Sequence, residues 1–134
     1  MINILSSSIG SLTNPKKLAD TFLSVKKSKL SPETIKKYLE YLSDSFLINA
    51  TLRYDIKGKK YIETPLKYYF SDIGLRNARL NFRQLEETHT MENILYNELL
   101  KRGYNVDVGV VQISEKNNEG TNSRISYEID FVVN

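Results

Sequence analysis

The spacing of apolar residues changes near residue 45, and this change limits the folds open to the chain. Before it, apolar residues recur every three to four positions, which is typical of short amphipathic helices. After it, "LINATLRYDI" and "YIETPLKYYF" show the features of two strands, joined by "KGKK", in which Gly58 supplies the backbone freedom of the turn. Helices followed by a two-stranded ribbon follow the order of a winged helix-turn-helix. The sequence therefore predicts an α+β protein whose residues 1–70 form a winged-helix domain.

Three helices are expected before the ribbon. Residues 2–9 form a weak helix, Asn14 followed by Pro15 starts the second, and Ser31 followed by Pro32 starts the third. In the third helix we expect an inward face of Ile35, Tyr38, Leu39 and Leu42 and an outward face of Thr34, Lys36, Lys37, Glu40 and Tyr41.

The second half, residues 71–134, is expected to contain a connector, one long helix and two strands. The connector is 71–90, with a short helix at 72–81, and the long helix is "MENILYNELLK" at 91–101 or 102, before Gly103. The strands are 104–113 and 125–133, with a polar loop between them. The long helix is predicted to pack against the rest of the protein through four apolar side chains, Met91, Ile94, Leu95 and Leu99, with Tyr96 as a further candidate.

The net charge of +3 conceals an uneven distribution. Residues 1–60 hold 11 Lys and Arg against 5 Asp and Glu, whereas residues 61–134 hold 8 against 11. A basic first half suits a polyanion such as double-stranded DNA, although the lysines could equally serve to solvate short helices. If DNA is bound, the third helix and the turn of the ribbon would contact it through Thr34, Lys36, Lys37, Tyr41, Lys57, Lys59 and Lys60.

Several classes of chemistry are excluded by what the sequence lacks. There is no cysteine, no phosphate-binding loop of the GxxxxGK[ST] type and no GxSxG element, so this chain by itself is not expected to hydrolyse ATP. His89 is the single histidine and is expected to be a residue of the connector rather than a catalytic base. No stretch approaches the roughly 20 apolar residues of a membrane span and no signal peptide is evident, so a cytoplasmic protein is expected.

Two acids of the second half, Glu92 and Asp130, form the remaining chemical pattern. A helix carboxylate placed over a strand carboxylate can bind Mg²⁺, which activates water for phosphodiester cleavage. On spacing alone, the alternative that these are a solvated helix acid and an Asp near a strand end remains open.

Three stretches together carry a resemblance to a known family. "TPLKYYFSDIGLRNARL", "MENILYNELLKRGY" and "EIDFVV" closely resemble the C-terminal domain of a large group of predicted prokaryotic AAA-type ATPases, and the likeness runs from "SSSIG" to residue 134. Those proteins carry an ATPase module, a winged helix and a PD-(D/E)xK nuclease-like domain of unknown function.

The resemblance implies roles for individual residues. Glu92 matches the acid of the first helix of the nuclease core, and Asp130 matches its metal-binding Asp. The third element, a Glu or Gln two residues before a Lys on the next strand, is expected about ten to twenty residues further on. The resemblance therefore implies a truncated nuclease-like α/β unit at 71–134, with a vestigial or incomplete metal site and no cofactor in this chain, while Mg²⁺ and ATP would belong to an intact parent.

The leading hypothesis is a non-catalytic C-terminal fragment of an AAA-type ATPase that acts as a DNA-binding or partner-docking module. One alternative is a Mg²⁺-dependent nuclease domain that is active only in the intact parent, and another is a free-standing winged-helix transcription regulator. The edge of the hairpin at 104–133 would be unpaired in a truncated sheet, so self-association through that edge is also expected.

Overall fold

The computed structural model describes residues 1–83, 87–116 and 122–134, which form five helices and four strands. Residues 84–86 of the predicted connector and 117–121 of the predicted loop lie outside the described residues. The elements in chain order are α1 (Ile2–Ser6), α2 (Pro15–Lys26), α3 (Pro32–Asp44), β1 (Ile48–Asp55), β2 (Lys60–Phe70), α4 (Ile73–Arg79), α5 (Glu87–Lys101), β3 (Val106–Lys116) and β4 (Asn122–Val133). The predicted α+β class is confirmed.

The predicted starts of the second and third helices are confirmed by their caps. The side chain of Asn14 accepts a hydrogen bond of 2.8 Å from the backbone N–H of Lys17, and Ser31 Oγ accepts one of 3.2 Å from the N–H of Thr34. Each bond satisfies an N–H group that has no partner within the first helical turn. Helix α1 is shorter than predicted and ends at Ser6.

The four strands form one mixed sheet in the order β2-β1-β3-β4. Strands β1 and β2 pair antiparallel, as do β3 and β4, and the two hairpins meet where Arg53–Asp55 of β1 pair parallel with Val108–Val110 of β3. The sequence pattern predicted both hairpins but not this parallel joint. As a result, the two halves of the chain share a single sheet.

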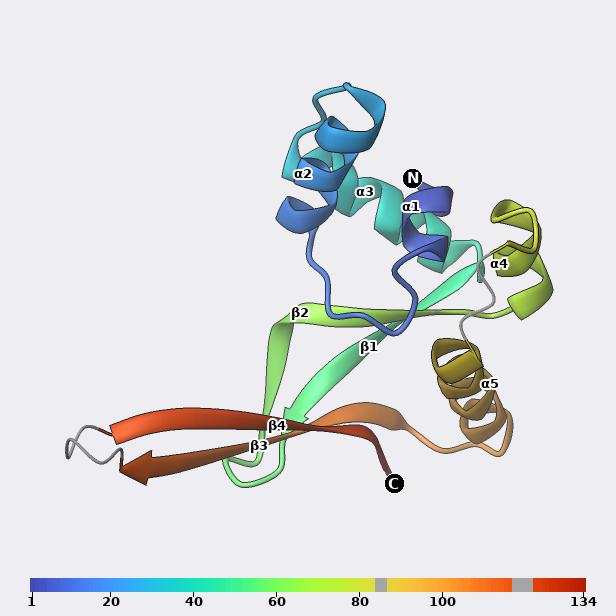
Figure 1. Cartoon of the computed structure of the whole chain (residues 1–134). Coiled ribbons are helices and arrows are strands. Elements are labelled where there is room, and N and C mark those ends of the chain that lie inside the picture. The colour runs from blue at the N-terminus through green and yellow to red at the C-terminus, as the bar shows by residue number, and fades with distance from the viewer. Residues whose placement is uncertain (84–86, 117–121) are drawn as a thin grey trace.

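The β1–β2 hairpin separates two apolar clusters. On one side, Tyr68 and Phe70 pack with buried residues of α1, α2 and α3, and on the other, Tyr69 packs with Tyr96 of α5 and Val106 of β3. Figure 1 shows the first three helices on one side of this hairpin and α5 on the other. Alternate residues of β2 therefore face two different environments.

Two predictions about α5 are wrong. The helix begins at Glu87 rather than at residue 91, and Met91, Ile94 and Leu95 are more than half exposed instead of packed. The buried residues of α5 are Asn93 and Tyr96. Tyr96 and Leu99 do pack against Tyr69 and Val106, as predicted. The contacting face is therefore shifted from the predicted one toward Asn93, whose polar bonds to β2 are not detected by periodicity.

The winged-helix and nuclease-like arrangements are not confirmed. Figure 1 shows the turn between β1 and β2 at the end of its hairpin remote from α3 and close to the β3–β4 hairpin. Because β1 pairs with β3 near this turn, the ribbon extends away from the helices. None of the helices in the described part of the chain is long and apolar enough to cross a membrane.

Candidate functional site

Lys67 of β2 lies at the centre of three carboxylates, and we call these four residues the Lys67 cluster. The Lys67 Nζ atom is 2.7 Å from Glu92 Oε1, 2.8 Å from Glu128 Oε1 and 3.8 Å from Asp130 Oδ1. The Lys67 side chain is only 4% exposed, whereas that of Asp130 is 70% exposed. An almost fully buried ammonium is thus compensated by acids from α5 and β4.

The alternation of β2 brings Tyr69 to the same side as Lys67. The Tyr69 hydroxyl donates a hydrogen bond of 2.5 Å to Glu92 Oε1, the oxygen that also accepts from Lys67. The Tyr69 ring stacks on that of Tyr96, with 4.3 Å between ring centroids. Glu92 is therefore fixed by two donors that come from one strand.

An irregularity in the β3–β4 pairing shapes the other wall of the cluster. Asp107 pairs with Val132 but Gly109 pairs with Ile129, so β4 has one extra residue at this point. Phe131 consequently reaches Tyr69 and Tyr96, on the side where Glu128 and Asp130 meet Lys67. Without the bulge, strict alternation would place Phe131 on the side of β4 opposite Asp130.

Asn93 fixes α5 against the end of β2. Its Oδ1 accepts a hydrogen bond of 2.7 Å from the N–H of Phe70, and its Nδ2 donates one of 2.7 Å to the carbonyl of the same residue. Asn93 is fully buried, and Asn97 Nδ2 donates a further bond of 2.9 Å to the Phe70 carbonyl. This clamp positions the neighbouring Glu92 over Lys67.

The surroundings of the cluster change the pKa of two of its groups. Burial by itself would lower the pKa of Lys67, but the hydrogen bonds and negative charges of Glu128 and Glu92 outweigh it and raise the pKa. Burial, with the hydrogen bond to Glu92, strongly raises the pKa of Tyr69. At neutral pH, Lys67 is therefore charged and the Tyr69 hydroxyl retains its proton.

The loop after α1 also approaches the cluster. Gly10 has a φ of +70°, and a Cβ atom there would lie 3.0 Å from both Glu92 Oε2 and His89 Nδ1. His89 Nδ1 is 3.7 Å from Glu92 Oε2. The prediction that His89 belongs to the connector is wrong, because α5 begins two residues before it.

Glu92 and Asp130 are brought together, but they do not fit a metal ion as they stand. Both line a cleft of about 360 Å³ between α5 and β4, yet both also face the Lys67 ammonium. In the described part of the chain, no group of three or more His, Cys, Asp or Glu side chains is arranged to hold a metal. The lysine occupies the position between the carboxylates where a cation would bind.

Sequence reasoning missed Lys67 and Tyr69 as parts of this site. The available signal was "LKYYF", in which one lysine interrupts the most apolar part of a strand. A lysine in such a position needs a buried partner, because an unpaired buried charge is very unfavourable.

The predicted DNA-contacting residues fall into two separate groups. Thr34, Lys37 and Tyr41 follow one stripe of α3, since residues three and seven apart share a helix face, and all but Thr34 are well exposed. Lys36 lies on a neighbouring stripe, 3.9 Å from Glu40. The other lysines are Lys57 and Lys59 of the β1–β2 turn and Lys60 at the start of β2. Figure 1 shows this turn remote from α3, so the structure does not bring the two groups together.

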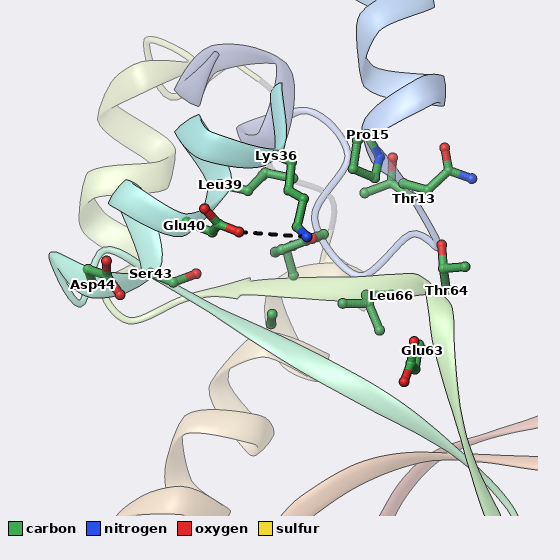
Figure 2. A pocket seen from close by; sticks show the side chains of 13 residues that line it. Thr13, Pro15, Lys36, Leu39, Glu40, Ser43, Asp44, Glu63, Thr64 and Leu66 are labelled. Atoms are coloured by element: carbon green, nitrogen blue, oxygen red, sulfur yellow. Dashed lines mark ion pairs between the residues drawn. The ribbon is translucent and has the colours of Figure 1, made fainter. Parts of the chain in front are cut away.

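A groove lies between α3 and the β1–β2 hairpin (Figure 2) and has a volume of about 440 Å³. Its apolar lining comes from α3, the start of α2 and both strands, and consists of Pro15, Leu39, Ala50, Leu66 and Tyr68. Its charged lining consists of Lys36, Glu40, Asp44 and Glu63. The groove is thus an apolar floor bordered by three acids and one lysine.

The fold and these two features define an α+β protein with one mixed sheet, a lysine-centred carboxylate cluster on one side and an apolar groove on the other. Residues 1–86 match the family described as "Domain of unknown function (DUF8612)", and the chain belongs to that family.

Two longer proteins are similar to this chain. An uncharacterized protein of Haemophilus influenzae is 39% identical over 115 residues, which are 86% of this chain and 28% of the relative. The uncharacterized protein MJ1544 of Methanocaldococcus jannaschii is 30% identical over 131 residues, which are 98% of this chain and 26% of the relative. The chain therefore spans about a quarter of the length of these relatives, and no solved structure matches it.

Proposed function

We propose that this chain is a non-catalytic docking module of a longer protein, and that it binds a peptide segment in the groove beside α3. The observation that carries the proposal is the groove itself, in which an apolar floor stays open between α3 and the strands. Concave apolar surfaces with a few polar groups at their border are typical binding sites. The resemblance to AAA-type ATPases supports a role within a larger assembly.

The border of the groove indicates the chemistry of its ligand. Glu40, Asp44 and Glu63 outnumber Lys36, and the Lys36–Glu40 pair is exposed and 3.9 Å long, so it stabilises little and can rearrange. A segment that places a bulky apolar side chain on the floor and Lys or Arg beside the acids would complement both features.

The experiment uses ¹H–¹⁵N spectra of the chain titrated with the octapeptide Gly-Ser-Arg-Leu-Phe-Arg-Ser-Gly. We expect shift changes at the backbone amides of Ala50, Leu66 and Tyr68. The same peptide with Glu in place of Arg should bind at least tenfold more weakly, because it would meet the acids of the groove.

Matched variants locate the binding. Asp44→Asn combined with Glu63→Gln should weaken binding of the Arg peptide about tenfold, whereas Asp20→Asn, an exposed acid on α2 outside the groove, should leave it unchanged. Equal binding of the two peptides, or shifts confined to residues outside the groove, would contradict the proposal.

The second candidate function is binding of duplex DNA through the Thr34, Lys37 and Tyr41 stripe of α3. The observation that favours it is the exposure of Lys37 and Tyr41 on one helix face, with Tyr41 62% exposed. Phosphate contacts by lysines make binding weaken steeply with salt. We expect Lys36→Ala with Lys37→Ala to reduce both the affinity and its salt dependence, with most of the effect due to Lys37.

A DNA titration at about 50 mM salt separates the two candidates. Salt-sensitive binding that is lost with Lys37→Ala would support DNA contact by α3, and binding lost instead with Lys57→Ala would locate the contact at the remote turn. The absence of any salt-sensitive binding would leave peptide docking as the function.

The nuclease alternative in a longer parent stays a prediction. It would require a third metal ligand from outside this chain and the displacement of Lys67 from Glu92 and Asp130.

A further inference from the structure

The cation that faces the carboxylates of Glu92 and Asp130 belongs to the protein itself. An ammonium group has three N–H donors, and that of Lys67 is within hydrogen-bond distance of Glu92 and Glu128 and faces Asp130 at 3.8 Å. Glu92 and Glu128 are therefore close enough to accept two of these donors, and Asp130 lies just beyond them.

Lys67 is poorly placed to leave this position. It lies within the β1–β2 ladder opposite Thr51, and its side chain is 4% exposed. Removing the ammonium from its partners without carrying it to water would leave a buried, unpaired charge, which is very unfavourable.

One oxygen of Glu92, Oε1, has little remaining capacity for a metal, while the other, Oε2, lies 3.7 Å from His89 Nδ1. The Oε1 atom already accepts from Lys67 at 2.7 Å and from the Tyr69 hydroxyl at 2.5 Å. Mg²⁺ requires nearly octahedral oxygen ligands at roughly 2.0–2.1 Å. An oxygen that already accepts two hydrogen bonds, one of them from an ammonium, does not provide such a ligand.

We infer that the Lys67 ammonium is the resident cation of this carboxylate cluster, that it excludes divalent cations from Glu92 and Asp130, and that its removal opens a cation site. Three carboxylates against one ammonium leave the cluster with excess negative charge. In the described part of the chain these carboxylates surround an ammonium and are not arranged as a metal site. Without the lysine, the oxygens of Glu92 and Glu128 that now lie 2.7 and 2.8 Å from Nζ would lose that partner, and they could close on a hard cation together with Asp130. This inference does not depend on the docking function.

The test is Mn²⁺ binding, followed by the electron paramagnetic resonance signal of the free ion. Wild-type protein should bind Mn²⁺ in the cluster at least tenfold more weakly than Lys67→Gln. Adding Asp130→Asn to Lys67→Gln should reverse the gain, whereas Lys60→Gln, a change at the exposed start of β2, should show no gain. Mn²⁺ binding by wild type that is lost with Asp130→Asn, or no gain in folded Lys67→Gln, would overturn the inference.

A second measurement on the wild type covers the case in which Lys67→Gln does not fold. The side-chain ammonium of Lys67 should give a slowly exchanging ¹H–¹⁵N signal, because its protons are buried and hydrogen-bonded. That signal should persist unchanged when Mg²⁺ is added in large excess over the protein. Loss or displacement of the signal by Mg²⁺ would overturn the inference.

Discussion

The two faces of β2 show how one strand can serve two purposes. On one face, Lys67 and Tyr69 are buried and bonded to Glu92, so the ammonium and the hydroxyl both have a partner. On the other face, Leu66 and Tyr68 form part of a floor that remains open beside α3. The comparison indicates that the acidic face is closed by the protein's own lysine, whereas the apolar face is available to a ligand.

Among single substitutions on the two faces, Lys67→Met is expected to have the largest effect on stability, because it removes the buried cation. We expect the free energy of unfolding at pH 7 to fall by about 3–5 kcal/mol, since three carboxylates lose their common partner. Urea denaturation followed by circular dichroism measures it. Lys60→Met at the exposed start of β2 is the control and should change stability by less than about 0.5 kcal/mol. A loss of less than about 1 kcal/mol for Lys67→Met would show that the cluster is solvated.

A smaller effect is expected from Asn93→Ala, which releases α5 from β2. The variant removes the side-chain amide of Asn93, which bonds to the N–H and the carbonyl of Phe70. We expect the free energy of unfolding to fall by about 2–4 kcal/mol. Asn97→Ala, which removes bonds at a less buried position, should cost less than half as much. Equal losses in the two variants would mean that the Asn93 clamp does not position Glu92.

The approach of the Gly10 loop to the cluster can be tested with two glycines. Gly10→Ala and Gly103→Ala both force a side chain into positive φ, which costs about 1 kcal/mol or more. Only Gly10→Ala also brings a Cβ to 3.0 Å from Glu92 and His89, because nothing lies within 4 Å of the Gly103 position. We expect Gly10→Ala to be the more destabilising by roughly 1 kcal/mol in thermal unfolding. Identical changes in melting temperature would place the loop away from Glu92.

The raised pKa values of Lys67 and Tyr69 predict a loss of stability in alkali. Each group keeps its proton more firmly in the folded state, so its contribution is complete below the unfolded pKa of about 10 and is lost as pH rises through the folded pKa. Unfolding free energy measured from pH 9 to 11 should therefore fall. The slope should be shallower in Tyr69→Phe, while Tyr41→Phe, at an exposed position, should behave as wild type. A Tyr69→Phe slope equal to that of the wild type would contradict the role of the Tyr69 hydroxyl.

The sequence predicted the elements better than their assembly. Helix starts at Asn14 and Ser31 follow from local hydrogen bonds, and these predictions are confirmed. The parallel joint between Arg53–Asp55 and Val108–Val110 depends on a contact between distant segments, which local spacing does not encode.

The candidate site was predicted only in part, again because it depends on contacts between distant segments. The resemblance singled out Glu92 and Asp130, and the structure brings both to one cleft. Lys67, which faces both acids, was not singled out, because its role appears only when α5 and β4 are brought to the same side chain of β2. The groove was missed as well, since its lining comes from four separate elements.

The most direct test of the closed acidic face is a double-mutant cycle of Lys67→Met and Glu92→Gln, measured by urea unfolding at pH 7. If the two groups are bonded as the structure shows, Glu92→Gln should destabilise the Lys67→Met variant much less than it destabilises the wild type. The expected coupling free energy is about 2 kcal/mol. A coupling below about 0.5 kcal/mol would mean that Lys67 and Glu92 act independently, and it would contradict a lysine-closed cluster.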